Sequence, residues 1–287
     1  MDLQDPIEVD IKEKNMKRKF TNCILKTFAV IFVFAMLLGA VSCTHNHKVT
    51  KTYEVDSVVE SISISAKKEA NISIEPSTDG KIRVVAITHT KVNCDISTDG
   101  TTLFLDIEDT RNFLGRLGEF HSPQVTVYLP AGEYTSLKIE TTTGNTTVPA
   151  DFSFASISIN GTTGKIHCSA QATDSINITN TTGEVSINNV TTNTLNVQIS
   201  TGDINLTNVI TTGKMSIEAT TGNIKFDGCD GAEIYATATT GSIQGSLLSS
   251  KIFLTSTKTG KVTVPHTTSG GVCDLSTSTG TINITIK

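Results

Sequence analysis

The sequence predicts an all-β protein, a single-stranded parallel β-helix (β-solenoid) whose rungs are 19–20 residues long. Three observations predict this fold. A Thr-Gly pair recurs at that spacing, alternating polar and apolar residues follow each pair, and a second alternating segment precedes the next pair. The composition agrees, because the chain has only 6 Pro and no Trp, and a 37% share of hydrophobic residues favours strands around a thin core.

The corner of each rung is predicted from the Thr-Gly pairs. We expect glycine to supply the backbone freedom that the turn needs, and threonine to stack on its copies in neighbouring rungs. Gly213 follows Gly202 by only 11 residues, so the spacing identifies a corner and Thr-Thr-Gly alone does not. The corner glycines are Gly144, Gly164, Gly183, Gly202, Gly222, Gly241, Gly260 and Gly280.

Two short strands are expected in each rung. Two positions after the glycine, seven of the eight residues are Ile or Val, with polar residues on either side. Apolar pairs such as Ile157 and Ile159 precede the next glycine, but Ile252 and Leu254 stand one residue out of register. Neither strand can bury its apolar face alone, so equivalent strands should stack at about 4.8 Å, with a right-handed winding.

The ends of the solenoid are less regular. Gly80 and Gly100 are again 20 residues apart, which predicts that the parallel β-helix spans residues 53–287. An insertion near 109–122 lacks alternation and is interpreted as a loop or short helix, or alternatively as a partner-binding protrusion. The last strand, TINITIK, is expected to leave an open edge that pairs with a second copy or is blunted by its terminal charge.

The N-terminal part is typical of targeting. We interpret residues 1–15 as an over-called start or a short cytoplasmic extension, 16–43 as a signal peptide, and 44–52 as a tether. The signal ends in a lipobox-like sequence, which predicts lipidation of Cys43. The alternative is an uncleaved N-terminal helix as the anchor. Both interpretations place the rest of the chain outside the cytoplasm of a bacterium, attached to a membrane.

Charge and residue patterns argue against several kinds of activity. The formal net charge of −5 disfavours nucleic-acid binding. Lys165, Glu184 and Asp203 share the position after the corner glycine, and a glycosidase would need two such carboxyls facing each other across the sugar. We interpret them as a solvated polar face.

Other candidate sites are equally weak. His45 and His47 are too few ligands for a metal site, and the DGCDG segment at 227–231 lacks the acids of a calcium loop, so it is read as a turn. Alternation points His167 outward and Cys168 inward, so they form no catalytic couple. We therefore predict no catalytic residue, cofactor or metal.

Four cysteines remain once the signal peptide and Cys43 are set aside, and the repeat argues against disulfides between them. Cys168 and Cys273 fall in different aliphatic ladders about five rungs apart, roughly 25 Å at the strand spacing, so both are interpreted as small core residues. The pattern does not place Cys94 or Cys229.

The repeated rungs, preceded by VTVYLPAGEYTSLKIETTTGN at 125–145, resemble the bacterial family of putative adhesins known as domain of unknown function 4097. They are similar also to the head domains of autotransporter adhesins. The resemblance implies an extracytoplasmic β-solenoid of the cell envelope, sometimes encoded beside envelope-stress regulators, with no catalytic residues to carry over.

From these features the sequence predicts a non-enzymatic surface lipoprotein, an adhesin or envelope scaffold that presents polar Thr and Asn ladders. Its partners would be a cell-surface protein or a polysaccharide, and its oligomeric state is left open. A polysaccharide-degrading enzyme built on the same helix, and an envelope-stress accessory protein acting through protein partners, remain as alternatives.

Overall fold

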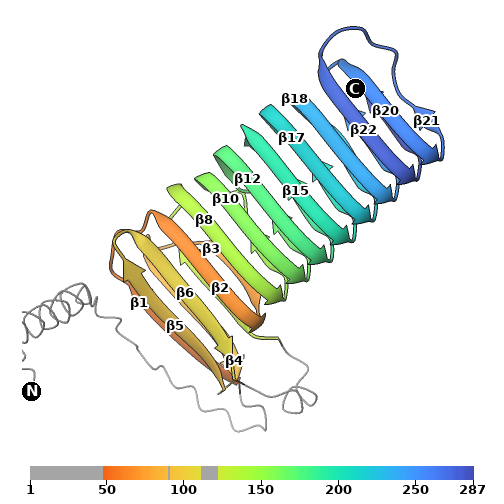
Figure 1. Cartoon of the computed structure of the whole chain (residues 1–287). Coiled ribbons are helices and arrows are strands. Elements are labelled where there is room, and N and C mark those ends of the chain that lie inside the picture. The colour runs from red at the N-terminus through yellow and green to blue at the C-terminus, as the bar shows by residue number, and fades with distance from the viewer. Residues whose placement is uncertain (1–47, 90, 111–121) are drawn as a thin grey trace, which may run out of the picture. The chain divides into compact units, whose positions relative to one another are not determined.

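The computed structural model describes residues 48–89, 91–110 and 122–287 (Figure 1). These residues form 23 strands, so the prediction of an all-β fold is confirmed. Nowhere in these ranges does a helix suited to crossing a membrane occur. Cys43, His45, His47, the segments assigned to residues 1–15 and to the signal peptide, and residues 44–47 of the expected tether lie outside the described residues, as do residues 111–121 of the expected insertion. The other tether residues, 48–52, belong to strand β1 (Lys48–Val55).

Sheet 1 contains the strands that lead into the corner glycines. Its strands are parallel except for the β5–β6 hairpin, and β14 (Thr191–Thr192) adds a short pairing to β17. From one edge to the other, its order is β5 (Val92–Asp99), β6 (Thr102–Asp109), β2 (Ser61–Glu69), β8 (Gly132–Thr143), β10 (Phe152–Thr163), β12 (Gln171–Thr182), β15 (Thr194–Thr201), β17 (Ile210–Thr221), β18 (Ile224–Thr240), β22 (Gly271–Thr279) and β20 (Lys251–Thr259).

Sheet 2 contains the strands that leave those corners. The first part of β18 belongs to it, because this long strand passes from sheet 2 into sheet 1. Its order is β1 (Lys48–Val55), β4 (Ile82–His89), β7 (Gln124–Leu129), β3 (Asn71–Pro76), β9 (Thr146–Val148), β11 (Ile166–Cys168), β13 (Val185–Asn188), β16 (Ile204–Thr207), β18, β19 (Ile243–Leu247), β23 (Ile282–Ile286) and β21 (Val262–Thr263).

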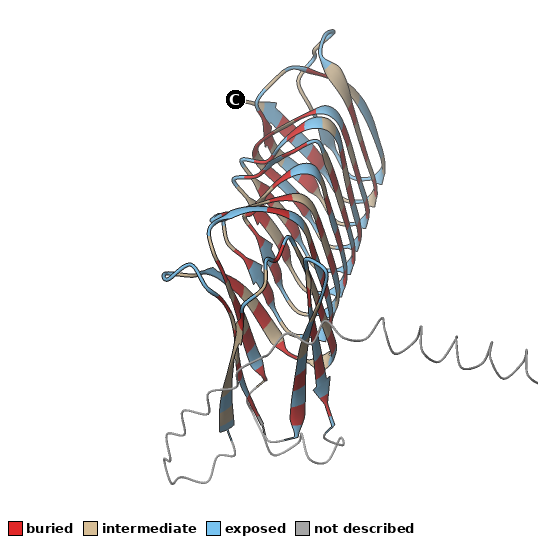
Figure 2. Cartoon of the chain, turned by 90° about the vertical axis from the view of Figure 1, so that its left-hand side faces the viewer, coloured by how far each residue is buried: buried red, intermediate tan, exposed pale blue. Residues whose placement is uncertain are grey.

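The core lies between the two sheets, and buried and exposed residues alternate along the strands (Figure 2). Ile157, Ile176 and Leu195 stand in register on neighbouring strands and are buried. The aliphatics two positions after the corner glycines are also buried, which confirms the predicted inward face. Val262 is the exception at 37% exposed, because it belongs to the outermost rung.

The corner glycines form a column through the stack. Gly202 has φ 137°, and a Cβ atom there would lie 2.1 Å from the carbonyl oxygen of Gly183. At Gly222 the corresponding distance, to the oxygen of Gly202, is 1.7 Å. Ala70 takes the place of glycine in the rung of β2 and β3. The backbones approach so closely that a corner residue can carry a side chain only where no corner of another rung lies on the side to which its Cβ points.

The residue after several of the corner glycines bonds the backbone of the neighbouring rung through its side chain. Asn145 Oδ1 accepts a hydrogen bond from the Lys165 amide at 2.9 Å, and Asn223 Oδ1 accepts one from the Ser242 amide at 2.9 Å. Asp203 does the same for the Asn223 amide at 2.7 Å. These side chains satisfy amides that would otherwise be left unpaired at the turn.

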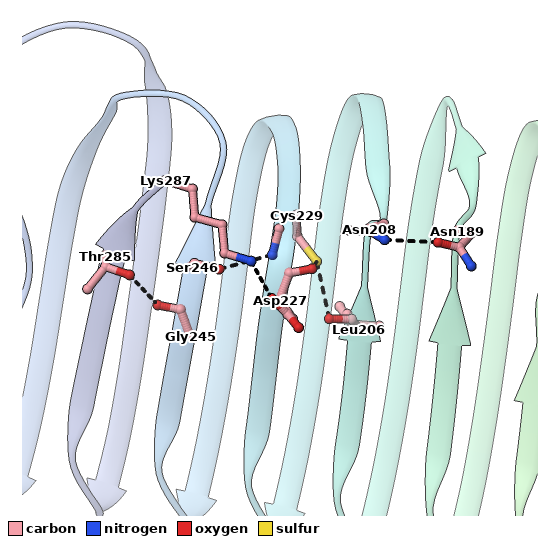
Figure 3. A network of polar contacts seen from close by, with 10 residues as sticks. Asn189, Leu206, Asn208, Asp227, Cys229, Gly245, Ser246, Thr285 and Lys287 are labelled. Atoms are coloured by element: carbon pink, nitrogen blue, oxygen red, sulfur yellow. Dashed lines mark hydrogen bonds and ion pairs between the residues drawn. The ribbon is translucent and has the colours of Figure 1, made fainter.

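A second corner, which the sequence analysis missed, lies where the chain passes back from sheet 2 to sheet 1. Asn189 and Asn208 adopt φ 56° and 51°, and Gly228 takes the equivalent place with φ 64°. Asn208 Nδ2 donates to Asn189 Oδ1 at 2.9 Å (Figure 3). The signal was present as Asn or Gly before an inward apolar residue, because asparagine and glycine tolerate the left-handed region best.

The prediction that Gly80 and Gly100 begin parallel rungs is wrong. Gly100 lies in the two-residue turn of the β5–β6 hairpin, and β4, which follows Gly80, runs antiparallel to β1 and β7. Both glycines have positive φ, of 74° and 59°, but no atom lies within 4 Å of a Cβ placed on either. The spacing here therefore reflects a hairpin turn at Gly100 and, at Gly80, a connection between β3 and β4, which do not pair with each other.

At the C-terminal end, the structure explains why Ile252 and Leu254 stand out of register, and it shows that the expected open edge is wrong. β20 keeps the register of its neighbour by turning Phe253 inward, so Ile252 and Leu254 face outward and are 41% and 51% exposed. The final strand is not an open edge, because β23 pairs with β19 on one side and β21 on the other. Among the strands described, β20 and β21 form the edges at this end.

We predict that Gly202→Ala destabilises the protein by about 3 kcal/mol or more, because the new Cβ would meet a backbone oxygen in a conformation that alanine avoids. Chemical denaturation measures the loss. Gly132→Ala is the matched control, since nothing lies within 4 Å of its Cβ position, and it should change stability little. Equal effects of the two substitutions would contradict the role given to the column.

Candidate binding groove

A shallow polar groove runs across sheet 1 just before the corner glycines. It consists of two adjoining hollows: one crosses β2, β8 and β10, and the other crosses β12, β15, β17 and β18. They adjoin because β10 and β12 are paired neighbours. Seven strands at about 4.8 Å give the groove a length of about 29 Å.

The pleat of the strands decides which side chains line the groove. Residues four and two positions before the glycine point outward and form its walls, while the backbone of the residue three positions before it, whose side chain points into the core, forms the floor. The walls are Glu140, Thr142, Asn160, Thr162, Thr179, Thr181, Gln198, Ser200, Glu218, Thr220, Thr237 and Thr239, with Ser65 and Lys67 of β2. Hydroxyl and amide groups therefore dominate.

The strands beneath the groove carry two buried polar side chains that point into the core and have an unsatisfied oxygen. Asn180 donates from Nδ2 to the Gly164 carbonyl oxygen at 2.9 Å, but its Oδ1 has no partner. Its amide fits above Gly161, where a Cβ would lie 2.6 Å from that Oδ1. Thr141 Oγ1 also lacks a partner. Both oxygens face the core, so they are not available to a ligand in the groove.

The carboxylates singled out by sequence bind neighbouring rungs. Glu184 accepts hydrogen bonds from Lys165 Nζ at 3.1 Å and Asn205 Nδ2 at 2.8 Å. The Lys165 hydrogen bond is the main reason that the pKa of Glu184 lies below its ordinary value, and Ser186 and Asn205 add to it against partial burial. A general acid needs the opposite shift. Asp203 Oδ1 accepts hydrogen bonds from the backbone amide and from Nδ2 of Asn223.

The other candidates also have structural partners. Asp227 pairs with Lys287 Nζ at 2.6 Å (Figure 3), and Asp230 pairs with Lys251 Nζ at 2.5 Å, so the acids of the DGCDG segment bind lysines. His167 is exposed and lies 3.3 Å from Ser169 Oγ. Cys168 points inward as predicted, and burial raises the pKa of its thiol to about 12, far too high for a nucleophile.

All four cysteines in the described part of the chain are buried and free. The interpretation of Cys168 and Cys273 as core residues is confirmed. Cys94 lies on β5, and Cys229 lies just after the second corner, where its Sγ contacts the Leu206 carbonyl oxygen at 3.3 Å (Figure 3). Each behaves as a small apolar side chain.

The family model described as Toastrack DUF4097 matches residues 59–285, which include every strand of the groove. The chain belongs to the Toastrack family. This confirms the resemblance inferred from the repeated rungs.

Several solved structures are similar to this Toastrack chain. A putative adhesin from Bacteroides fragilis has 21% identity and a TM-score of 0.46, over 83% of this chain and 97% of the other. A putative lipid binding protein from Parabacteroides distasonis has 12% identity and a TM-score of 0.47, over 82% and 96%. A putative adhesin from Parabacteroides merdae has 16% identity and a TM-score of 0.38, over 83% and 96%. The comparison with curated proteins gave no match.

We predict that Glu184→Gln reduces the loss of unfolding free energy that this Toastrack protein shows as the pH falls. The lowered pKa of Glu184 means that its charged form stabilises the fold above its ordinary pKa, and that this contribution disappears as the pH falls through the folded-state pKa. The difference should be below about 1 kcal/mol, because the side chain is 38% exposed.

The measurement is urea unfolding of wild type and variant from about pH 7 to about pH 3. Lys165→Gln is the control that removes the partner and keeps the acid. An unchanged pH dependence in Glu184→Gln would show that Glu184 does not stabilise the corner.

Proposed function

We propose that the protein is a non-enzymatic surface protein of a bacterial cell envelope, acting as an adhesin or scaffold through the polar groove of sheet 1. Lipidation of Cys43 would hold it at the membrane, with the rungs wound right-handed outside the cytoplasm. The observation that carries the proposal is the groove itself, a straight row of hydroxyl and amide groups across seven strands.

The ligand class follows from the lining. Hydroxyl and amide groups both donate and accept hydrogen bonds, so they suit a neutral ligand rich in hydroxyls. Because the walls repeat at every strand, a linear polymer lying across the strands would meet the same groups many times, and weak contacts would add up. A surface polysaccharide has this chemistry.

Catalysis is less well supported than binding. Glu140 and Glu218 are the carboxylates of the groove walls, and they stand four strands apart, about 19 Å at the strand spacing. Glycosidases need carboxyls about 5 to 9.5 Å apart. Glu140 also forms an ion pair with Lys138 at 2.7 Å. The rival function, a polysaccharide-degrading enzyme, therefore lacks a suitable pair in this groove.

We predict that Thr181→Val with Thr220→Val weakens binding to a neutral linear polysaccharide by about tenfold. The substitutions keep β-branched side chains but remove two hydroxyls, and each hydrogen bond contributes about 0.5–1.5 kcal/mol. Binding to immobilised neutral glycans, and attachment of cells displaying each protein, would measure the loss.

The matched control is Thr147→Val with Thr263→Val, two exposed threonines on sheet 2, which should bind like wild type. Equal binding by both double variants would refute the groove as the binding surface. Release of sugar fragments during incubation would favour the enzymatic rival.

A further inference from the structure

The last two rungs stand in reverse order in space. β22 and β23 lie between the rung of β18 and β19 and the rung of β20 and β21, although they come later in the chain (Figure 1). From β8 to β19 the rungs follow the order of the sequence. The segment Gly271–Lys287, here called the inserted segment, therefore occupies a slot whose two walls precede it in sequence.

The inserted segment fits this slot better than the rung before it would. Its inward side chains, Cys273, Leu275, Ile282 and Ile284, are buried. In the outermost rung, Phe253 is only partly buried and Thr255 is an exposed residue at an inward position. Moving the inserted segment outward would expose more apolar surface, which opposes that arrangement.

The outermost rung has the period needed to fill the slot itself. Gly260 follows Gly241 by 19 residues and has the φ of a corner glycine, 151°. During synthesis the outermost rung emerges before the inserted segment, so it is the first available partner of β18 and β19. The observed order requires the later segment to enter between them.

The walls of the slot are joined independently of the inserted segment. Lys251 in β20 forms an ion pair with Asp230 in β18 at 2.5 Å, and its side chain is only 4% exposed. Burial alone would raise the pKa of Asp230, but hydrogen bonds from Lys251, Ser249 and the Gly231 amide lower it. Separating such a pair leaves a buried charge, so the pair holds the two walls together.

The entrance of the slot has room only for glycine. A Cβ at Gly270 would lie 1.8 Å from the Ser250 carbonyl oxygen, and one at Gly271 would lie 1.8 Å from that of Ala232. The connection from Val264 to Gly270 contains no strand. Its Thr267 hydroxyl donates to the Lys251 carbonyl oxygen on β20.

We propose that the slot also accepts the inserted segment of a second copy, which gives a strand-exchanged dimer. The strand pairings of the segment are all with the two walls, so the same pairings form when the segment belongs to another chain. Exchange of an identical element is a common route to dimers when a connecting loop can open. The strand-free connection before Gly271 is that loop.

Two variants, each with one added cysteine on the outer face, test the exchange, since the four native cysteines of the described residues are buried. Thr237 Oγ1 on β18 and Ser276 Oγ on β22 lie 3.1 Å apart on the outer face. Thr237→Cys chains are mixed with Ser276→Cys chains, unfolded, refolded together at increasing protein concentration, and oxidised. We expect a disulfide-linked heterodimer whose share rises with concentration, because the link forms only when the segment crosses between chains.

Two controls accompany the mixture. One chain carrying both Thr237→Cys and Ser276→Cys should form an internal link at low concentration, which shows that the geometry permits the disulfide. Thr237→Cys mixed with Ser256→Cys should give no link, because β22 keeps these positions about 10 Å apart. The proposal is overturned if the internal link forms while no heterodimer appears at any concentration, or if the second mixture links equally.

Discussion

The close approach of backbones at the glycine corner is the constraint on which the stack depends. Each carbonyl oxygen in the column occupies the space that a Cβ of the next rung would need, as at Gly202 and Gly222. Because strands on both sides of the corner must stay hydrogen-bonded to their copies, the corner cannot widen to admit a side chain. The glycine spacing therefore sets the length of every rung and keeps the strands in register.

That register also produces the groove. Once the strands are aligned at the corner, outward residues at the same distance before each glycine must form columns, and hydroxyl groups spread along the sequence become a continuous wall. The groove therefore follows from the repeat, without loops or a separate domain. The carboxylates near the corner are already used to hold rungs together, which favours a binding role over a catalytic one.

A parallel stack exposes strand edges at both of its ends. The two ends of this stack are completed in different ways. At the β1 end, antiparallel strands and a hairpin extend both sheets. At the other end, the segment with the better apolar pattern takes the inner place, and the weaker rung becomes the edge. The buried Lys251–Asp230 pair spans this reversal. The rungs at this end therefore stand in the order that buries more apolar surface, and not in their order along the chain.

The sequence by itself determined the all-β class, the period, the inward face and the glycine corner, because each depends on local alternation and on backbone conformations that recur with the repeat. It contained the second corner at Asn189 and Asn208, although only as a faint signal. Only the tertiary structure decided the hairpin at Gly100, the outward turn of Ile252 and Leu254, and the insertion of β22 and β23. These features depend on which segments compete for the same neighbour, and that competition is between residues far apart in the chain. The groove likewise needed the fold, since its walls meet only after seven strands stand side by side.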